Sequence, residues 1–232
     1  MPKRGLSQET LKIIACVTML LDHIGATFCP GIGLRIVGRI AFPIYCFMLV
    51  EGAHHTASLK KYRVRLLVGA LLAEIPFDLA FSHRSAVLFD WSSNSVMLTL
   101  MLGFCMIEAM KRLSGFPQMA VILPFYLLAE WMHTDYGGLG ILIIAVFALT
   151  RGLPREKLYQ VIALCLVVYP GARAIIGSVA VNLEWFAVLA LIPIFCYDGR
   201  KLTRNRAVQW GFYLFYPVHI ALLALLEMIF FK

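Results

Sequence analysis

The stretch from Leu11 to Pro30, LKIIACVTMLLDHIGATFCP, is an apolar run long enough for one membrane helix, and it carries Asp22 and His23 in its second half. About 20 apolar residues cross a bilayer as a helix. An ionised Asp near the bilayer centre costs about 2.5–3.5 kcal/mol on insertion scales, so a chain that keeps one there is expected to have a partner and a use for it. We therefore interpret this stretch as a retained first membrane helix and not as a cleaved signal peptide.

The composition of the whole chain indicates the same class of protein. Of its 232 residues, 61% are hydrophobic and 15% are charged, and the mean hydropathy is +0.81. Soluble domains are nearer ~45–50% apolar and ~25% charged. The chain is thus expected to be all-α, a polytopic bundle of membrane helices in contact with the lipid bilayer. The net charge of +8 is spread over several loops, which argues against a nucleic-acid partner.

Nine membrane spans follow from the apolar blocks. We expect them at residues 11–28, 34–54, 64–82, 95–111, 117–133, 138–150, 157–169, 181–197 and 208–231. The short apolar segment 171–180 leaves a tenth crossing or a re-entrant half-span open. No loop is long enough for a separate soluble domain, so residues 1–232 are expected to form one transmembrane domain.

The basic residues give the orientation through the positive-inside rule. With the amino terminus in the cytoplasm, 16 of the 21 basic residues lie in cytoplasmic segments. They are Lys3, Arg4, Lys12, Lys60, Lys61, Arg63, Arg65, Lys111, Arg112, Arg151, Arg155, Lys157, Arg200, Lys201, Arg204 and Arg206. Nine spans then leave the carboxyl terminus outside.

The six cysteines suggest neither a disulfide framework nor a zinc site. Cys16, Cys46, Cys105, Cys165 and Cys196 fall inside apolar runs without a CxxC pair, and they are interpreted as buried small hydrophobic residues. Cys29, near the outer edge of the first span, is the one plausible exception. We expect no metal.

Several ionisable residues fall deep in the predicted membrane. At about 1.5 Å per residue, His23 lies about 18 Å and His219 about 16 Å from the cytoplasmic edge. Glu74 lies at about 15 Å and Asp78 at about 21 Å by the same estimate. Exposing each of these groups separately to lipid would be costly, so we expect one shared polar cavity.

Asp22 and His23 point about 100° apart on a helix, so they cannot hold each other as a carboxylate–imidazole pair. The functional interpretation makes His23 a general base, because imidazole titrates near neutrality and can accept a proton from a hydroxyl or an amine. The alternative is a polar contact between helices.

Arg35 and Arg39 share a helix face at positions i and i+4. A guanidinium cannot shed its charge, so Arg39 needs a carboxylate. Glu74 and Asp78, also four residues apart, are the expected partners. Such a network is either purely structural or orients Asp22, His23 or the substrate.

On the cytoplasmic side, residues 50–67 (VEGAHHTASLKKYRVRLL) gather charge at the mouth of the expected cavity. The cluster suits a phosphate-bearing ligand, with Arg65 best placed for bidentate contact. The alternative is ordinary positive-inside charge. The candidate cofactor-binding residues are Arg65, Lys61, Arg63, His54 and Glu51.

Two outer motifs supply candidate substrate-binding residues. AEWMHTDYGGLG (129–140) contains Glu130, Asp135 and Tyr136, and FYLFYPVHI (212–220) contains His219. These residues either line an outer opening or form a polar turn and a structural histidine.

Together these motifs resemble the TraX family. LKIIACVTMLLDHIG (11–25), LRIVGRIAFPIYCFMLVEGAHHT (34–56), KKYRVRLLVGALLAEIPFDLAF (60–81), AEWMHTDYGGLG and FYLFYPVHI are similar to its successive motifs and occur in the same order. The family's namesake acetylates the amino terminus of pilin. More distantly, the chain resembles polytopic acyltransferases of cell-surface sugars, including the lysosomal heparan acetyltransferase. Their catalytic candidate is a His in the outer half of the first span, which His23 matches, whereas KKYRVR matches their cytoplasmic Arg motif only loosely.

The resemblance implies an acyltransferase of the bacterial cytoplasmic membrane that uses acetyl-CoA or a similar donor. His23 would deprotonate the acceptor, Asp22 with Arg39, Glu74 and Asp78 would orient it, and the acceptor would be a peptide, a glycan or a lipid-linked molecule. A proton- or ion-coupled transporter that uses the same buried charges is the main alternative. A noncatalytic scaffold explains the buried charges less well.

Overall fold

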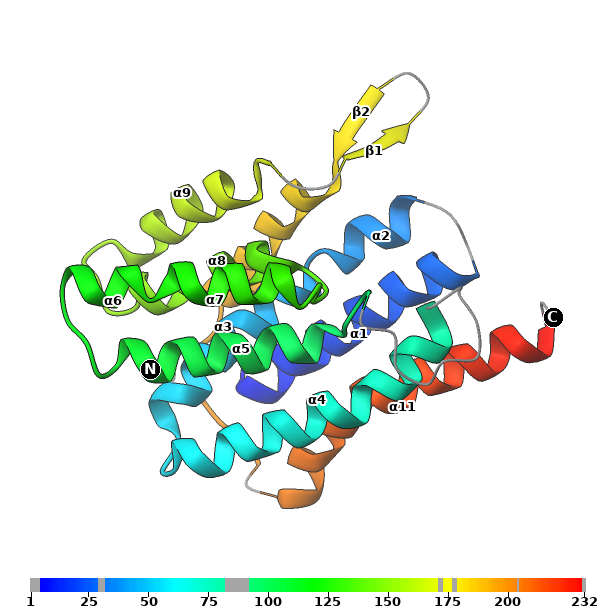
Figure 1. Ribbon diagram of the computed structural model, residues 1–232, viewed down its shortest axis with the longest axis horizontal. Coiled ribbons are helices and arrows are strands. Elements are labelled where there is room, and N and C mark those ends of the chain that lie inside the picture. Colours follow the sequence, from blue (N-terminus) through cyan, green and yellow to red (C-terminus); the bar gives the residue numbers. More distant parts are fainter. Residues whose placement is uncertain are drawn as a thin grey trace. The chain divides into compact units, whose positions relative to one another are not determined.

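A computed structural model describes residues 5–28, 32–81, 92–170, 173–176, 179–203 and 205–230. Its elements follow the chain as a series of helices with one strand pair (Figure 1). They are α1 (Gln8–Thr27), α2 (Ile32–Gly38), α3 (Ala41–His55), α4 (Leu59–Phe81), α5 (Val96–Met110), α6 (Phe116–Ala120), α7 (Ile122–Trp131), α8 (Gly137–Thr150), α9 (Glu156–Val168), β1 (Arg173–Ile176), β2 (Val179–Asn182), the 3₁₀-helix η1 (Leu183–Ala190), α10 (Leu191–Phe195) and α11 (Arg206–Phe230).

The chain divides into two compact units. Unit 1 consists of residues 1–48 and 152–215, and unit 2 consists of residues 49–151 and 216–232. In unit 1, α1 and α2 lie side by side (Figure 1), and η1 contacts both α2 and α9. In unit 2, α5 contacts both α4 and α8, and α7 packs on α8. The expectation of a single domain stays a prediction.

The predicted spans coincide with helices. Each of the nine spans matches one or two helical elements of the described chain. Three helical segments are long and apolar enough to cross a membrane, namely Gln8–Thr27, Ile32–His55 and Ala207–Phe230. The apolar helices Val96–Met110, Gly137–Thr150 and Leu183–Phe195 are shorter. A helical membrane protein is therefore supported, whereas the number of crossings and their orientation stay predictions.

The second span is interrupted between α2 and α3. The amides of Arg39 and Ile40 donate to the carbonyls of Ile36 and Val37, three residues back, at 3.3 Å each. Such bonds tighten the last turn of a helix. Pro43 lies in the first turn of α3, where an amide has no partner within the helix, so the chain can restart there.

The described residues of segment 171–180 are strands and not a tenth helical span. Arg173–Ile176 and Val179–Asn182 pair as an antiparallel hairpin, with Arg173 opposite Asn182 and Ile176 opposite Val179. The hairpin is visible as the β1–β2 arrows in Figure 1. Residues 173–176 and 179–182 are thus strands, while the remaining elements agree with the expected helical bundle. A two-stranded ribbon satisfies its backbone by pairing between the strands.

Candidate active site

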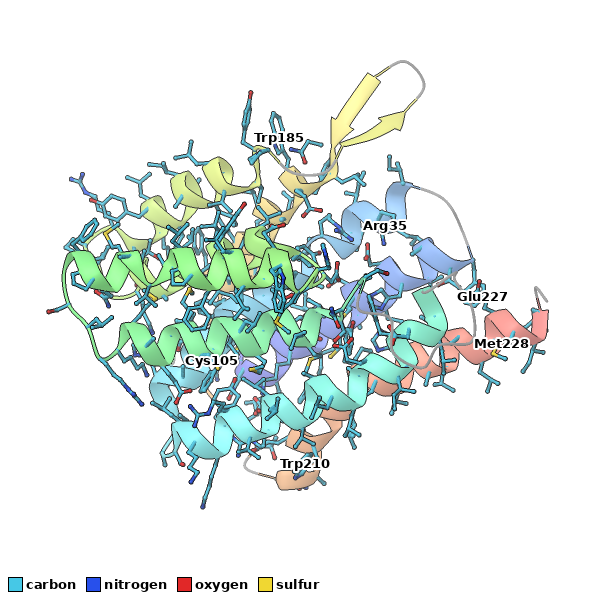
Figure 2. All side chains as sticks on the ribbon, viewed as in Figure 1. Arg35, Cys105, Trp185, Trp210, Glu227 and Met228 are labelled. Carbon is cyan, nitrogen blue, oxygen red and sulfur yellow. The ribbon has the colours of Figure 1, made fainter. Side chains whose placement is uncertain are left out.

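Asp22 is the centre of a buried charge network in unit 1. Its Oδ1 and Oδ2 accept hydrogen bonds from Nη2 of Arg39 at 2.9 and 2.8 Å, and Oδ2 also accepts one from Nη1 of Arg35 at 2.9 Å (Arg35 is labelled in Figure 2). Asp22 and Arg39 expose only 7% and 9% of their surface. Charge-assisted hydrogen bonds away from water are strong, so Asp22 is held firmly. Arg35 lies in α2, Arg39 follows its last residue Gly38, and both side chains reach Asp22, as their spacing of four residues had suggested.

Glycines allow α1 and α2 to approach closely at this network. A Cβ added to Gly38 would lie 2.2 Å from the Cβ and Oδ1 atoms of Asp22, and one added to Gly25 would lie 2.7 Å from Cβ of Leu34. Small residues at helix contacts let backbones come together and bring polar side chains within reach of each other. Asp22 can therefore pack against α2 because Gly38 has no Cβ atom.

Glu184 of η1 completes the network. Nη1 of Arg39 donates to its Oε1 at 2.9 Å, and Glu184 exposes only 5% of its surface. Two guanidiniums thus face two carboxylates, and their formal charges cancel. A guanidinium stays charged even when buried, so this balance makes its burial tolerable.

Two carboxylates pair with Arg39 that the sequence had not assigned to it. Asp22 and Glu184 form ion pairs with Arg39. Of the expected partners, Glu74 accepts from Ser95 instead, and the pairing of Arg39 with Asp78 stays a prediction. Glu184 follows Arg39 by 145 residues, so no local spacing connects them. The one signal in the sequence is that Glu184 lies near the outer start of an apolar block, at the depth expected for Arg39.

The backbone of Glu184 is anchored at the start of η1. Oδ1 of Asn182 accepts a hydrogen bond from the Glu184 amide at 2.9 Å, and Nδ2 of Asn182 donates to the carbonyls of Val168 and Tyr169 at 3.1 and 2.8 Å. Asn182 therefore ties the end of α9 to the first turn of η1. The neighbouring Trp185 exposes 54% of its surface, and its ring stacks on Tyr169.

His23 follows Asp22 on α1 and is half-buried. Successive residues of a helix are turned by about 100°. The direction in which the imidazole points is therefore set by the same helix rotation that presents Asp22 to Arg39. Fixing one side chain restricts the other.

In unit 2, Glu74 has a different partner from the one predicted. Its carboxylate accepts hydrogen bonds from the Ser95 amide at 3.1 and 3.2 Å and from the Ser95 hydroxyl at 2.7 Å. Ser95 precedes α5, so Glu74 satisfies an amide at the beginning of that helix. Asp78, one turn further along α4, is buried as well. Both residues thus lie in the protein interior, as expected.

The turn between α7 and α8 in unit 2 is held by backbone contacts. Asp135 donates its amide to the carbonyl of Asn94 at 2.7 Å, and Asn94 donates its own to the carbonyl of His133 at 2.9 Å. Glu130 accepts a hydrogen bond from the Gly138 amide at 2.7 Å, at the start of α8. Tyr136 has a positive φ of 64°. These contacts give Glu130 a capping role, and substrate binding by Glu130, Asp135 and Tyr136 stays a prediction.

His219 is buried on α11 beside Tyr216. The two rings meet edge to face with their centroids 5.6 Å apart, and both residues are almost fully buried. This geometry fits a structural histidine and leaves the predicted role in substrate binding untested.

The predicted cofactor cluster lies at the basic end of unit 2, which we define as Glu51, His54, His55, Lys60, Lys61, Arg63, Arg65, Glu108, Lys111, Arg112 and Arg151. Nε of Arg151 donates to Oε1 of Glu51 at 2.7 Å, and Nη1 of Arg63 donates to Oε2 of Glu108 at 3.1 Å. Lys61 is exposed, and the guanidinium of Arg65 lies 5.4 Å from the ring centre of Tyr62. The sequence had not predicted the two acid–base pairs.

Lys111 directly follows Met110, the last residue of α5. Its ammonium group donates to the carbonyl of Ala53 near the end of α3. Cations at the ends of helices complement the helix dipoles.

The candidate residues divide between the two units. Asp22, His23 and Arg39 belong to unit 1, and the other predicted site residues belong to unit 2. The single shared cavity stays a prediction, and Cys29 lies outside the described residues. Within the described ranges, no group of three His, Cys, Asp or Glu side chains is arranged to hold a metal ion.

The chain is similar to curated proteins along nearly its whole length. It is 33% identical to a probable fimbrial assembly protein, FimC, of Dichelobacter nodosus, with 94% of each chain covered. It is 24% identical to the protein TraX of Escherichia coli, covering 95% of this chain and 87% of that protein. An uncharacterized protein of Rickettsia prowazekii is 25% identical over 85% of this chain and 73% of its own length. No solved structure matches.

The family model described as TraX protein matches residues 7–227. This range includes the Asp22–Arg39–Glu184 network and the basic end of unit 2. The chain therefore belongs to the TraX protein family.

Proposed function

We propose that this chain is a membrane-embedded acyltransferase that moves an acyl group, most simply acetyl, from acyl-CoA to a hydroxyl or amino group of an extracytoplasmic acceptor. The observation that carries the proposal is the placement of His23 directly after Asp22, whose carboxylate is held by Arg35 and Arg39 at 2.8–2.9 Å. An imidazole on a helix whose rotation is fixed by buried ion pairs is suited to general base catalysis.

In the proposed step, His23 accepts the proton of the acceptor hydroxyl or neutral amine. The acceptor oxygen or nitrogen forms a bond to the carbonyl carbon of the thioester. The carbon–sulfur bond then breaks, and the CoA thiolate leaves and takes up the proton from the imidazolium. Proton transfer by a positioned side chain contributes about 10²–10⁴-fold to such rates.

The basic end of unit 2 is the proposed site for the phosphates of the donor. Seven of its residues are basic, and only Glu51 and Glu108 are acidic. Both acids are already neutralised by Arg151 and Arg63. Lys61 and Arg65 would contact phosphate, since guanidinium and ammonium groups bind phosphate oxygens.

The acceptor is proposed from the names of the relatives. One relative is named a probable fimbrial assembly protein, and two are named TraX. We infer that this chain acts in the bacterial cytoplasmic membrane on a pilus or fimbrial subunit or on a glycan attached to one. The positive-inside orientation would place the donor site in the cytoplasm and the acceptor on the other side.

The proposal is tested in cells that lack the gene and are complemented with the wild-type chain or with His23→Ala. Mass spectrometry of pilus subunits and surface polymers should detect an acyl group only with the wild-type chain. Calorimetry of acetyl-CoA with the purified protein separates the proposal from ion transport, since a transporter has no reason to bind this thioester. Acylation that persists with His23→Ala would remove His23 from the mechanism.

A further inference from the structure

We propose that Glu184 is a positioning residue of this reaction, which holds Arg39 so that Asp22 keeps one orientation and His23 faces the acceptor. The proposal rests on the proposed function, because it concerns the same site. It adds a residue from η1 that the motifs around His23 do not contain.

A continuous set of ion pairs connects Glu184 to α1. Oε1 of Glu184 lies 2.9 Å from Nη1 of Arg39, and Nη2 of the same guanidinium lies 2.8 Å from Oδ2 of Asp22. A guanidinium is planar and rigid, so holding one nitrogen restricts the direction in which the other donates. Releasing Glu184 allows the guanidinium of Arg39 to turn, and Asp22 is then held in its present direction by Arg35 alone. The α1 helix thus loses one of the two contacts that fix its rotation.

The backbone of Glu184 is held in place by hydrogen bonds of Asn182. Asn182 accepts from the Glu184 amide and donates to two carbonyls at the end of α9. Glu184 also lies in the first turn of a 3₁₀-helix of eight residues. Runs of 3₁₀-helix longer than about four residues are uncommon and often mark functional segments.

Charge balance gives Glu184 a second effect on the site. With Glu184 present, the buried guanidinium of Arg39 faces two buried carboxylates, and the partly exposed Arg35 also pairs with Asp22. Without the charge of Glu184, the buried guanidinium of Arg39 loses one of its ion pairs. Such a loss is unfavourable for a buried charge and is expected to rearrange the site or draw in water.

One oxygen of Glu184 is held at an energetic cost. Oε2 is buried and has no hydrogen-bond partner among the described residues. Buried polar atoms are normally paired, and an exception calls for an explanation. The ion pair with Arg39 explains this exception. Because Oε1 is directed at Arg39, the carboxylate cannot turn Oε2 toward a donor.

The test uses Glu184→Gln, which keeps the shape and removes the charge, and Glu184→Asp, which keeps the charge. Full-length proteins in lipid nanodiscs are given radiolabelled acetyl-CoA and membranes of a strain lacking the gene as the acceptor source. We expect Glu184→Gln to lower kcat about 10–100-fold, with KM for acetyl-CoA changed less than about twofold. Glu184→Asp should recover most of kcat. Glu227→Gln, on α11 (Figure 2), is the matched control and should behave as wild type.

The outcomes separate this proposal from the function on which it rests. No transfer by the wild-type chain refutes the acyltransferase. If the wild type transfers acetyl and Glu184→Gln has the same kcat, only the positioning role is refuted. The positioning role is also refuted if Glu184→Asp lowers kcat as much as Glu184→Gln does, because that result indicates a steric role. If Glu184→Gln fails to fold, the same assay is run on Asn182→Ala, which removes the side chain that anchors the Glu184 amide. A lower kcat with an unchanged KM supports positioning, and a wild-type kcat overturns it.

Discussion

Replacing Gly38 by Ala should disrupt the α1–α2 contact that holds Asp22. The new Cβ would lie 2.2 Å from Asp22, and it must move away by about 1.2 Å to reach an ordinary contact of 3.4 Å. Overpacking of this kind costs about 1–3 kcal/mol. If the shift breaks one of the bonds from Arg39 to Asp22, a further ~1.5–3 kcal/mol is lost, as is typical of hydrogen bonds to charged groups.

Two other glycines of the same helix pair provide matched controls. Nothing lies within 4 Å of a Cβ added to Gly33 on α2, whereas one added to Gly25 meets Leu34 at 2.7 Å. Alanine is favoured over glycine inside a helix by about 0.5–1 kcal/mol. Gly33→Ala should therefore be neutral or slightly stabilising, and Gly25→Ala should fall between it and Gly38→Ala.

The assay is SDS denaturation of the purified variants in mixed micelles, followed by circular dichroism. We expect a difference of at least about 1.5 kcal/mol between Gly38→Ala and Gly33→Ala. Equal stability of the two variants would show that Asp22 does not pack against α2 at this glycine.

Two further predictions concern polar contacts outside the Asp22 network. Ser95→Ala removes the hydroxyl that donates to Glu74 at 2.7 Å and should lower the free energy of unfolding by about 1–3 kcal/mol. The control Ser93→Ala, at an exposed site, should leave the free energy of unfolding unchanged. Identical denaturation midpoints of the two variants would refute this prediction. The Arg200 amide and guanidinium lower the pKa of the Asp198 carboxyl, which also accepts from the Gly5 amide. This stabilisation is present above the ordinary Asp pKa and is lost as the pH falls through the lowered value. Hydrogen exchange should show Gly5 protected at neutral pH and unprotected only in stronger acid, and loss of protection near neutrality would contradict the pairing.

The sequence predicts the helices of this protein well because long apolar blocks have few alternatives in a bilayer. It also predicts that Arg35 and Arg39 act together, since their spacing of four residues places them on one helix face. Both confirmed features depend on local periodicity. The burial of Asp22, Glu74 and Asp78 was likewise expected from their positions inside apolar runs.

The sequence does not predict which acid meets which base. Arg39 pairs with Glu184 and not with Glu74 because η1 packs against α2. The α2–η1 contact joins residues that are far apart in the chain. The contact of the Glu130 carboxylate with the Gly138 amide at the start of α8 was not predicted either. Hydrogen-bond partners of this kind are set by tertiary packing, for which one sequence carries little signal.

The most direct test of the account is acetyl transfer by the purified chain. Wild-type protein in nanodiscs, radiolabelled acetyl-CoA and acceptor membranes are compared with the same reaction using His23→Ala and with the control His133→Asn, at an exposed turn whose φ of 47° Asn tolerates. The account predicts labelled acceptor with the wild type and the control, and none above background with His23→Ala. Equal labelling by all three proteins would contradict it.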